Sequence, residues 1–429
     1  MAQKGIAGRR AAIALLGRVL QGHEPLSQAA DTSGGPLERL SPPERATALR
    51  LTTTVLRHLE PADRALAPFL RKTPPPTIRN ALRLGMVEMG VDHAAPHGVV
   101  NSIVTILRKT PKTAHLAGLA NAVLRRAADS SGSFADLPPQ KLPRWLRQPL
   151  VHAWGRDAVT AMEMALPAQP PLDLTTKPGL TPRIEGLNPL PTGGFRLVAP
   201  GQISTLPGYD EGEWWVQDAS AALAMRLLDP KPGETVLDLC AAPGGKTMQA
   251  AAAGADVTAL DISGPRLARL RANLTRTGLE AEIITADALH WSPPAPFAAI
   301  LLDAPCSATG TIRRHPDLPF VKDGSDLPAL TRLQSQLIDR ALSWLAPGGR
   351  LVFCTCSLLP EEGETQITAA LARHPGLTVS RPALPGLDPG WITKEGGIRL
   401  RPDYWADRGG MDGFYMALLT QSATASKEP

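Results

Sequence analysis

No stretch of this 429-residue chain is apolar for long enough to cross a membrane. A spanning helix needs roughly 18 consecutive apolar residues. The N-terminal segment KGIAGRRAAIALLGRVL resembles a secretory signal only faintly, because Arg18 interrupts it and its amphipathic pattern continues beyond. We therefore expect a soluble, cytoplasmic monomer with no membrane partner.

Cysteine is scarce as well, with only Cys240, Cys306, Cys354 and Cys356. Four cysteines do not form a disulfide framework in a chain of this length. The C-x-C pair has no nearby histidine and lacks the repeated spacing of zinc ligands. We therefore expect reduced thiols and no metal.

Two common nucleotide-binding motifs are also missing. The segment A-A-P-G-G-K-T at 241–247 spaces its glycines differently from both G-x-G-x-x-G and the P-loop. Because no catalytic His or Tyr stands out either, a nicotinamide-dependent dehydrogenase is disfavoured.

The net charge is only +5, but it is unevenly distributed. Residues 1–130 hold 18 Lys and Arg against 9 Asp and Glu, a charge of +9, which leaves −4 for the remaining 299 residues. A basic N-terminal part predicts a polyanionic partner, RNA or DNA rather than a membrane. A solvated, arginine-rich helical surface would have the same charge.

Residues from about 6 to 130 have the apolar spacing of short helices separated by Pro and Gly. Ser41, Pro42 and Glu44 together are typical of a helix start. The polar segment 23–37 is expected to be a loop. This pattern predicts an all-α bundle of five or six helices as a domain at 1–130. The predicted helices lie near 11–20, 41–60, 61–71, 76–89, 98–107 and 113–127.

Beyond residue 130 the pattern changes twice. Residues 131–211 are rich in Pro and Gly and predict a small α+β linking subdomain. From 212 to 420 strands alternate with helices, which predicts an α/β, doubly wound domain. The tail at 421–429 is expected to be disordered. In the linking subdomain we predict helices near 143–154 and 158–165 and strands at 172–176, 194–199 and 214–218. In the α/β domain we predict strands at 235–240, 255–263, 281–288, 298–305 and 350–356, and an antiparallel edge strand at 413–419.

The segment TVLDLCAAPGGKT at 235–247 follows a predicted strand and opens a helix. Small residues let a ligand approach the backbone, and a helix start offers free N–H groups. Asp261 ends the next predicted strand, where a carboxylate can accept hydrogen bonds from ribose hydroxyls. Asp287 ends the third, in a position suited to an adenine amino group. This predicts a nucleoside-bearing cofactor, unless Asp261 is only a helix cap and Asp287 only a turn residue. The candidate loop residues are Cys240, Ala241, Ala242, Pro243, Gly244, Gly245 and Lys246.

Cys306 in LLDAPCSATG and Cys356 in FCTCSLLPEE each follow a predicted buried strand. Ligands and reactants of an open parallel sheet bind at the carboxyl ends of its strands. Two thiols beside a cofactor loop therefore suggest covalent catalysis on a small planar target. Alternatively, both thiols are small packing residues. Cys354 lies on the same strand face as Cys356 and is interpreted as structural.

The residues that follow Cys306, Arg313, Arg314 and His315, are also candidates. They could hold substrate phosphates or form a solvated loop.

Several of these segments together resemble the Sun-type bacterial RNA (cytosine-5) methyltransferases with a NusB-like N-terminal domain. The resemblance implies a Rossmann-like S-adenosylmethionine methyltransferase domain behind an RNA-binding, NusB-like bundle. The segment LDLTTKP at 172–178 departs from the L-R-V-N-like strand of relatives, which puts the RNA contacts of the central segment in doubt. The matching segments are GEWWVQDASA, VLDLCAAPGGKT, ALDIS with Arg266, ITADA, LLDAPCSATGTIRRHPD, CTCSLLPEEGE, MDGFYMALL and, in the front part, LANAVLRR.

The same resemblance implies a chemistry and a substrate. The cofactor would be S-adenosylmethionine, and the target would be C5 of a cytosine in 16S ribosomal RNA. Cys356 would attack C6 of the base, Cys306 would assist release, and Asp303 would contact the N3 edge of the base. The base must be unstacked, which favours a loop or bulge in RNA. The cofactor contacts would be residues 240–246, Asp261, Arg266, Asp287 and Asp303.

Two other readings remain open at this point. The same chemistry could act on transfer RNA or another RNA. Alternatively, the basic bundle could make the protein chiefly an RNA-binding assembly or antitermination factor.

Overall fold

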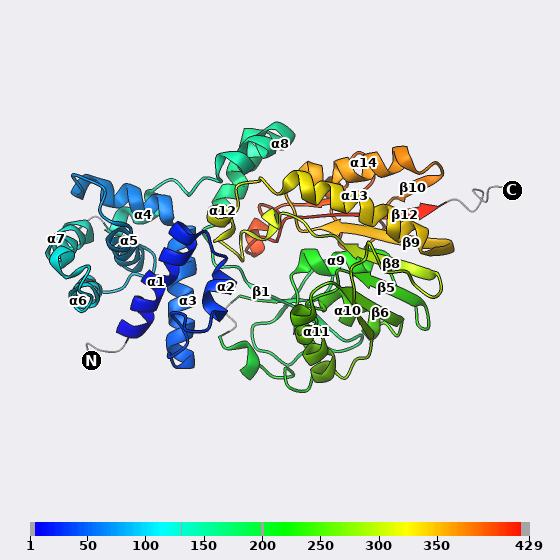
Figure 1. The fold of residues 1–429 in the computed structure, drawn as a ribbon, viewed down its shortest axis with the longest axis horizontal. Coiled ribbons are helices and arrows are strands. Elements are labelled where there is room, and N and C mark those ends of the chain that lie inside the picture. Colours follow the sequence, from blue (N-terminus) through cyan, green and yellow to red (C-terminus); the bar gives the residue numbers. More distant parts are fainter. Residues whose placement is uncertain (1–4, 130, 199–200, 422–429) are drawn as a thin grey trace. The chain divides into compact units, whose positions relative to one another are not determined.

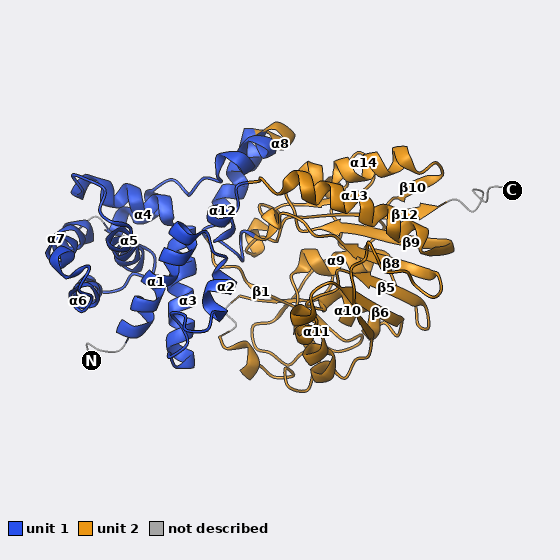
Figure 2. Ribbon diagram, in the orientation of Figure 1, with its two compact units in different colours: residues 1–151, 156–167, 312–323 blue, residues 152–155, 168–311, 324–429 orange. Residues whose placement is uncertain are grey.

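The computed structural model describes residues 5–129, 131–198 and 201–421, which form two compact units (Figure 2). The first unit combines 1–151, 156–167 and 312–323, and the second combines 152–155, 168–311 and 324–429. These units divide the chain differently from the predicted domain ranges, because 312–323 and most of 131–167 belong with the helical bundle. Within the described ranges, no helix combines the length and the apolar character needed to cross a bilayer.

The first unit is helical, as predicted (Figure 1). Its core is built from helix faces that include Leu15, Ile78 and Leu82, all fully buried. The predicted helix start at Ser41 is confirmed, since its backbone N–H and its hydroxyl both donate to Glu44. The helices are α1 (Ile6–Gly22), α2 (Leu26–Asp31), α3 (Pro42–Arg57), α4 (Leu59–Leu66), α5 (Pro76–Gly90), α6 (Pro96–Arg108), α7 (Ala117–Ala128) and most of α8 (Arg144–Ala165).

Helix α2 corrects the sequence prediction, which made 23–37 a loop throughout. Leu26 and Ala29 are buried in the core of the bundle, and this tertiary packing stabilises a helix of only six residues.

The segment 312–323, with α12 (Leu318–Val321), also packs on this bundle. Phe320 and Val321 contact the core of the unit. The buried carboxylate of Asp317 accepts a hydrogen bond of 2.9 Å from the backbone N–H of Leu26, at the start of α2. A segment from the far end of the sequence is therefore part of the N-terminal fold.

The central part contains one interrupted helix and one small sheet. Gly155, with φ of 82°, separates the two halves of α8, as predicted for 143–154 and 158–165. The sheet is antiparallel in the order β2-β3-β1-β4, and a buried ion pair of 2.6 Å between Arg196 and Asp173 joins two of its strands. Residues 199 and 200 lie outside the described residues. The strands are β1 (Leu172–Thr176), β2 (Asn188–Pro189), β3 (Phe195–Leu197) and β4 (Trp214–Val216).

The α/β half contains an eight-stranded sheet with the path β10-β12-β9-β8-β5-β6-β7, in which β11 also pairs with β12. The five predicted parallel strands are confirmed. The strand at 413–419 is antiparallel, as predicted, but it lies between β9 and β10 rather than at an edge. Residue 421 ends β12, and 422–429 lie outside the described residues. The strands are β5 (Thr235–Leu239), β6 (Asp256–Asp261), β7 (Glu282–Thr285), β8 (Phe297–Asp303), β9 (Leu345–Thr355), β10 (Leu377–Ser380), β11 (Ile398–Leu400) and β12 (Phe414–Gln421).

Helices cover both faces of this sheet (Figure 1). Alternate strand residues enter two separate cores: Leu237 and Leu302 face α13 and α14, whereas Val236 and Leu301 face α9. This alternation gives the near-continuous apolar strands of a doubly wound fold. The helices are α9 (Ala219–Leu228), α10 (Gly245–Ala252), α11 (Gly264–Thr277), α13 (Leu327–Ser343) and α14 (Glu364–Arg373).

Candidate active site

The strand register brings the predicted site segments to one edge of the sheet. In β5, Leu239 pairs with Leu302 of β8 and with Leu260 of β6, and Asp303 pairs with Cys354 of β9. The loops that follow these strands therefore start side by side. This is the edge at which parallel sheets bind their ligands.

The loop after β5 turns sharply into α10. Cys240 has φ of 61° and Gly244 has φ of 103°, so both lie in the left-handed region. A Cβ on Gly244 would lie 2.7 Å from Leu270 of α11. Glycine is therefore required here by both conformation and space. Burial raises the pKa of the Cys240 thiol, which fits packing rather than reactivity at this position.

Asp261 and Arg266 hold this loop. The buried carboxylate of Asp261 accepts hydrogen bonds from the backbone N–H groups of Ala242, at 3.1 Å, and Ser263, at 2.8 Å. The guanidinium of Arg266 donates to the carbonyl of Ala242 and lies 3.7 Å from Asp261. Both predicted cofactor residues thus contact the loop directly.

Asp287 lies just beyond the end of β7, and its side chain is 41% exposed. Its Oδ1 accepts a hydrogen bond of 2.9 Å from the N–H of Leu289. Each carboxylate can accept about four hydrogen bonds, so both Asp261 and Asp287 have acceptor capacity left for a ligand. Two carboxylates and a loop of small residues fit the hydroxyl and amino donors of a nucleoside-bearing cofactor.

Lys246 links the loop at 240–246 to β8. Its Nζ lies 2.7 Å from Oδ2 of Asp303 and 5.2 Å from the ring centre of Phe414. Burial alone lowers the pKa of Lys246, but the carboxylate of Asp303 outweighs it and holds that pKa above its usual value. The thiol of Cys354 donates to the other oxygen of Asp303 over 3.6 Å. Asp303 is therefore held from two sides.

Asp238 is a buried carboxyl that sequence reasoning missed. It lies on β5 with no exposed surface, and one oxygen accepts a hydrogen bond of 2.6 Å from the hydroxyl of Thr247. Its other oxygen has no hydrogen-bond partner among the residues that the structure describes. Burial raises the pKa of Asp238 to about 7.

The two candidate catalytic thiols meet at the carboxyl ends of β8 and β9. The sulfur atoms of Cys306 and Cys356 lie 3.5 Å apart, and both residues are half-buried free cysteines. The hydrogen bond with Cys356 raises the pKa of Cys306 well above its usual range, and burial raises it further. Burial likewise raises the pKa of Cys354, whose sulfur points to Asp303.

The loops that carry the two cysteines are interlocked through glycine. The N–H of Gly310 donates to the carbonyl of Cys356, and the N–H of Gly413 donates to the carbonyl of Gly310, both at 2.9 Å. A Cβ on Gly310 would lie 1.9 Å from the oxygen of Gly413. No other residue fits at this position without moving one of the loops.

Of the three residues considered as phosphate contacts, Arg313 is only 1% exposed, so that hypothesis is wrong for Arg313. It is buried because the segment 312–323 folds with the bundle, where Arg57 donates to its carbonyl at 3.1 Å. Burial, together with the charge of Arg313, lowers the pKa of Arg57 to about 10. Arg314 and His315 are exposed, and their role stays a prediction.

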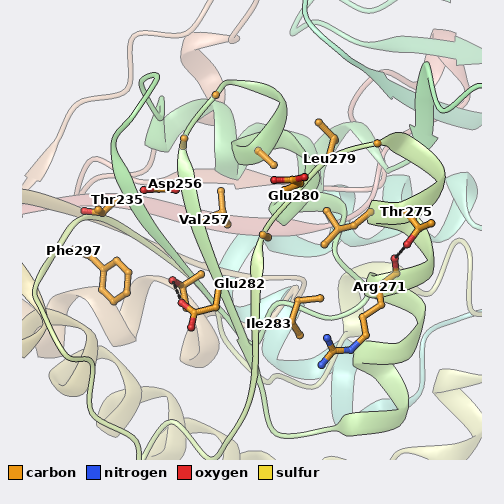
Figure 3. A pocket seen from close by; sticks show the side chains of 17 residues that line it. Thr235, Asp256, Val257, Arg271, Thr275, Leu279, Glu280, Glu282, Ile283 and Phe297 are labelled. Atoms are coloured by element: carbon orange, nitrogen blue, oxygen red, sulfur yellow. Dashed lines mark hydrogen bonds between the residues drawn. The ribbon is translucent and has the colours of Figure 1, made fainter.

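A hollow of about 1090 Å³ in the second unit lies at the opposite edge of the sheet (Figure 3). It is bordered by the first residues of four parallel strands, among them Thr235, Asp256 and Phe297. It contains carboxylates and an arginine but no thiol. Because this hollow lies away from the thiols, we do not assign the reaction to this edge of the sheet despite its volume. In the described part of the chain, no three His, Cys, Asp or Glu side chains are grouped so as to hold a metal ion.

Two family models match the sequence. The model described as 16S rRNA methyltransferase RsmB/F matches residues 225–420, and the model of the NusB family matches residues 7–129. The chain is also 35% identical to the Ribosomal RNA small subunit methyltransferase B of Pseudomonas syringae pv. tomato, over 98% of both chains.

Two solved structures share the fold. One is the crystal structure of PH0851, with a TM-score of 0.72 at 23% identity, covering 96% of this chain and 98% of that one. The other is NSun6 from Pyrococcus horikoshii with SFG, with a TM-score of 0.57 at 21% identity, covering 65% of this chain and 98% of that one.

Proposed function

This chain belongs to the 16S rRNA methyltransferase RsmB/F family, and on that premise we propose that it methylates C5 of a cytosine in 16S ribosomal RNA. It is an S-adenosylmethionine-dependent RNA methyltransferase. The observation that carries the finer proposal is the meeting of two thiols, 3.5 Å apart, at the carboxyl ends of β8 and β9, where Asp303 ends β8.

We propose that the loop at 240–246 with Asp261, Arg266 and Asp287 binds S-adenosylmethionine. The cofactor supplies an electrophilic methyl group carried on a sulfonium sulfur. The small residues of the loop admit it to the backbone, and the two aspartates accept hydrogen bonds from its nucleoside. Arg266 keeps Asp261 and the loop together.

C5 of cytosine is a poor nucleophile until a thiolate adds at C6. Cys356 supplies this thiolate: its sulfur forms the C6–S bond, and the electron pair of the C5=C6 bond moves to C5. C5 would then take the methyl group as the methyl–sulfur bond of the sulfonium breaks, which leaves a neutral thioether as the leaving group. Asp303 contacts the N3 edge of the base and stabilises the charge that develops in the ring. The proton on C5 then passes to solvent, the C5=C6 bond re-forms, and the C6–S bond breaks to return the thiolate.

Cys306 assists that last step. The raised pKa of Cys306 keeps it a neutral thiol, which makes it a poorer nucleophile than a thiolate. A neutral thiol 3.5 Å from the sulfur of Cys356 can donate a hydrogen bond to it as the bond to C6 breaks. The two cysteines thus have different roles.

We also propose the domain roles predicted from the sequence: residues 1–130 bind RNA, 131–211 link, and 212–420 catalyse. The match of 7–129 to the NusB family and the charge of +9 on 1–130 support an RNA-binding role for the bundle.

The roles of the cysteines are tested with Cys306→Ala and Cys356→Ala in the full-length protein. We expect Cys306→Ala to accumulate a covalent protein–RNA adduct that survives denaturing electrophoresis. We expect Cys356→Ala to form no adduct and to be inactive. Retained methylation by Cys356→Ala would contradict the assignment.

The substrate is tested by bisulfite sequencing of RNA from a strain that lacks the gene. Loss of one 5-methylcytosine from 16S ribosomal RNA is expected. Loss of a 5-methylcytosine from transfer RNA instead would show that transfer RNA is the substrate of the same reaction.

A further inference from the structure

A buried glutamate that the mechanism above does not use contacts residues next to both cysteines. Glu362 ends a 3₁₀ turn at Pro360–Glu362, shortly after Cys356, and has no exposed surface. In the described residues no Lys, Arg or His forms an ion pair with it. Burying a carboxylate without a cationic partner is costly, so its hydrogen bonds must hold it in place.

Those hydrogen bonds go to the loop of the other cysteine. Oε1 of Glu362 accepts from the backbone N–H of Ser307 at 2.9 Å, and Oε2 accepts from the hydroxyl of the same serine. Ser307 is the residue directly after Cys306. Hydrogen bonds to a buried charged acceptor are among the strongest in proteins, so this interaction fixes the backbone beside Cys306.

A third donor comes from α13. The amide nitrogen of Gln334 donates to Oε1 of Glu362 at 3.0 Å and to the carbonyl of Pro305 at 2.9 Å, and Gln334 is itself fully buried. Pro305 is the residue directly before Cys306. Glu362 and Gln334 together therefore hold the backbone on both sides of that cysteine.

The residues on either side of Cys356 are also hydrogen-bonded to Glu362 or to its partner Ser307. The hydroxyl of Ser357, directly after Cys356, lies 3.2 Å from the hydroxyl of Ser307. The hydroxyl of Thr355, directly before Cys356, donates to the backbone carbonyl of Glu362 at 2.9 Å. Each neighbour of Cys356 is thus connected to Glu362 directly or through one serine.

We propose that Glu362 is a positioning residue for product release, which holds the loop of Cys306 against the loop of Cys356 at the separation that release requires. This rests on the roles proposed above for the two cysteines. Without the carboxylate, Thr355 keeps its hydrogen bond to the backbone carbonyl of residue 362, whereas Ser307 is left without both of its acceptor oxygens there. Cys306 is therefore displaced more than Cys356, and attack persists while release fails.

The test compares variants of the full-length protein on 16S ribosomal RNA transcribed in vitro, with radiolabelled S-adenosylmethionine. For Glu362→Ala we expect a covalent protein–RNA adduct at least about 10-fold above the wild-type level and multiple-turnover methylation about 100-fold slower. Glu362→Gln keeps the acceptor oxygen for Ser307 and Gln334, so we expect it to restore most of the rate. Glu361→Ala removes the exposed neighbouring acid and should behave as wild type.

Should Glu362→Ala not fold, Ser307→Ala provides a second test, since it removes the hydroxyl bond to Glu362, together with the hydroxyl contacts to Ser357 and Thr309, and keeps the backbone N–H bond to Glu362. We expect an intermediate excess of adduct and a loss of rate of about 10-fold. In either variant, slower methylation with adduct at the wild-type level would overturn the proposal, because that pattern indicates a structural defect alone.

Running Cys306→Ala on the same gel distinguishes a failure of the role proposed for Glu362 from a failure of the role proposed for Cys306. If Cys306→Ala traps the adduct while Glu362→Ala turns over normally, only the role of Glu362 is overturned. If Cys306→Ala traps no adduct, the release role of Cys306 is overturned, and the role of Glu362 with it.

Discussion

At the scale of single residues, burial changes the pKa of Asp238 strongly. Opposing effects act on this pKa. Burial raises it, whereas the hydrogen bond from the hydroxyl of Thr247 and the charge of Lys246 lower it. Burial prevails, because the side chain has no exposed surface and one carboxylate oxygen has no donor among the described residues. The folded protein therefore binds a proton at Asp238 up to a pH of about 7.

This predicts a pH dependence of stability with a definite sign. Between pH 4 and 7 the folded state binds a proton at Asp238 that the unfolded state has released, so the free energy of unfolding falls as pH rises through this window. Asp238→Asn should remove this contribution. We expect the difference in unfolding free energy between wild type and variant to change by about 2–4 kcal/mol from pH 4 to 8.

Urea unfolding of both proteins at several pH values measures this difference. Because each comparison is made at one pH, the titration of other groups cancels. A difference that does not vary with pH would show that Asp238 ionises normally in the folded protein.

At the same scale, the sequence predicted the site residues that stand in recognisable motifs. It did not predict residues whose role depends on burial. Cys306, Cys356 and Asp303 follow strands in recognisable motifs and were predicted. Glu362 stands in the segment CTCSLLPEEGE, yet nothing in the letters distinguishes it from the exposed Glu361. Only the packed structure shows which of two adjacent glutamates faces inward.

At the scale of elements, the parallel strands and the long helices followed from apolar periodicity, whereas some of the short elements did not. The strands β5, β6, β7, β8 and β9 were all predicted, because their buried runs are bounded by turns. Helix α2 and strand β11 have six and three residues, too few to repeat a period. They form because neighbouring elements bury them.

Helices α6 and α7 line a groove of about 440 Å³ that we expect to bind RNA phosphates. Its lining includes the exposed Arg108 and Arg125, and neither forms a salt bridge within the described part of the chain. Replacing both with glutamine should weaken RNA binding about 10-fold near 0.1 M salt. It should also reduce the slope of log affinity against log salt by about 2, because each arginine neutralises one phosphate.

Filter binding of the full-length protein to 16S ribosomal RNA at several salt concentrations measures both quantities. The double variant Arg71→Gln, Lys72→Gln is a matched control, since it removes two exposed charges from another part of the same bundle. Equal losses of affinity in both double variants would contradict a role for the groove and indicate a general effect of net charge.

At the scale of the whole molecule, neither compact unit is formed by one continuous stretch of the sequence. Residues 312–323 follow the loop of Cys306 by only a few positions, yet Phe320 and Val321 pack against the core of the N-terminal bundle. The sequence showed no sign of this, because an apolar pair in a Pro-rich segment can be buried by any nearby surface.

This arrangement predicts a specific weakness in a fragment of residues 168–429. Without the bundle, the segment 312–323 lacks the apolar surface on which Phe320 packs and the hydrogen bond from Leu26 to Asp317, so it should become accessible. Limited chymotrypsin digestion should cleave the fragment at Phe320 at least about 10-fold faster than the full-length protein. Equal cleavage rates would show that the segment is held by interactions within the second unit.

The sequence by itself determined the all-α and α/β classes, the main strands, the loop at 240–246 and the positions of both thiols. These depend on local periodicity and on motifs of consecutive residues, which a linear pattern carries. Tertiary structure alone decided which acids are buried, that Arg313 is not available to phosphates, and that 312–323 belongs to the bundle. It also brought the sulfurs of Cys306 and Cys356 to 3.5 Å from each other. The physical reason is that burial and distance depend on residues far apart in the chain, which meet only when the sheet and the bundle are formed.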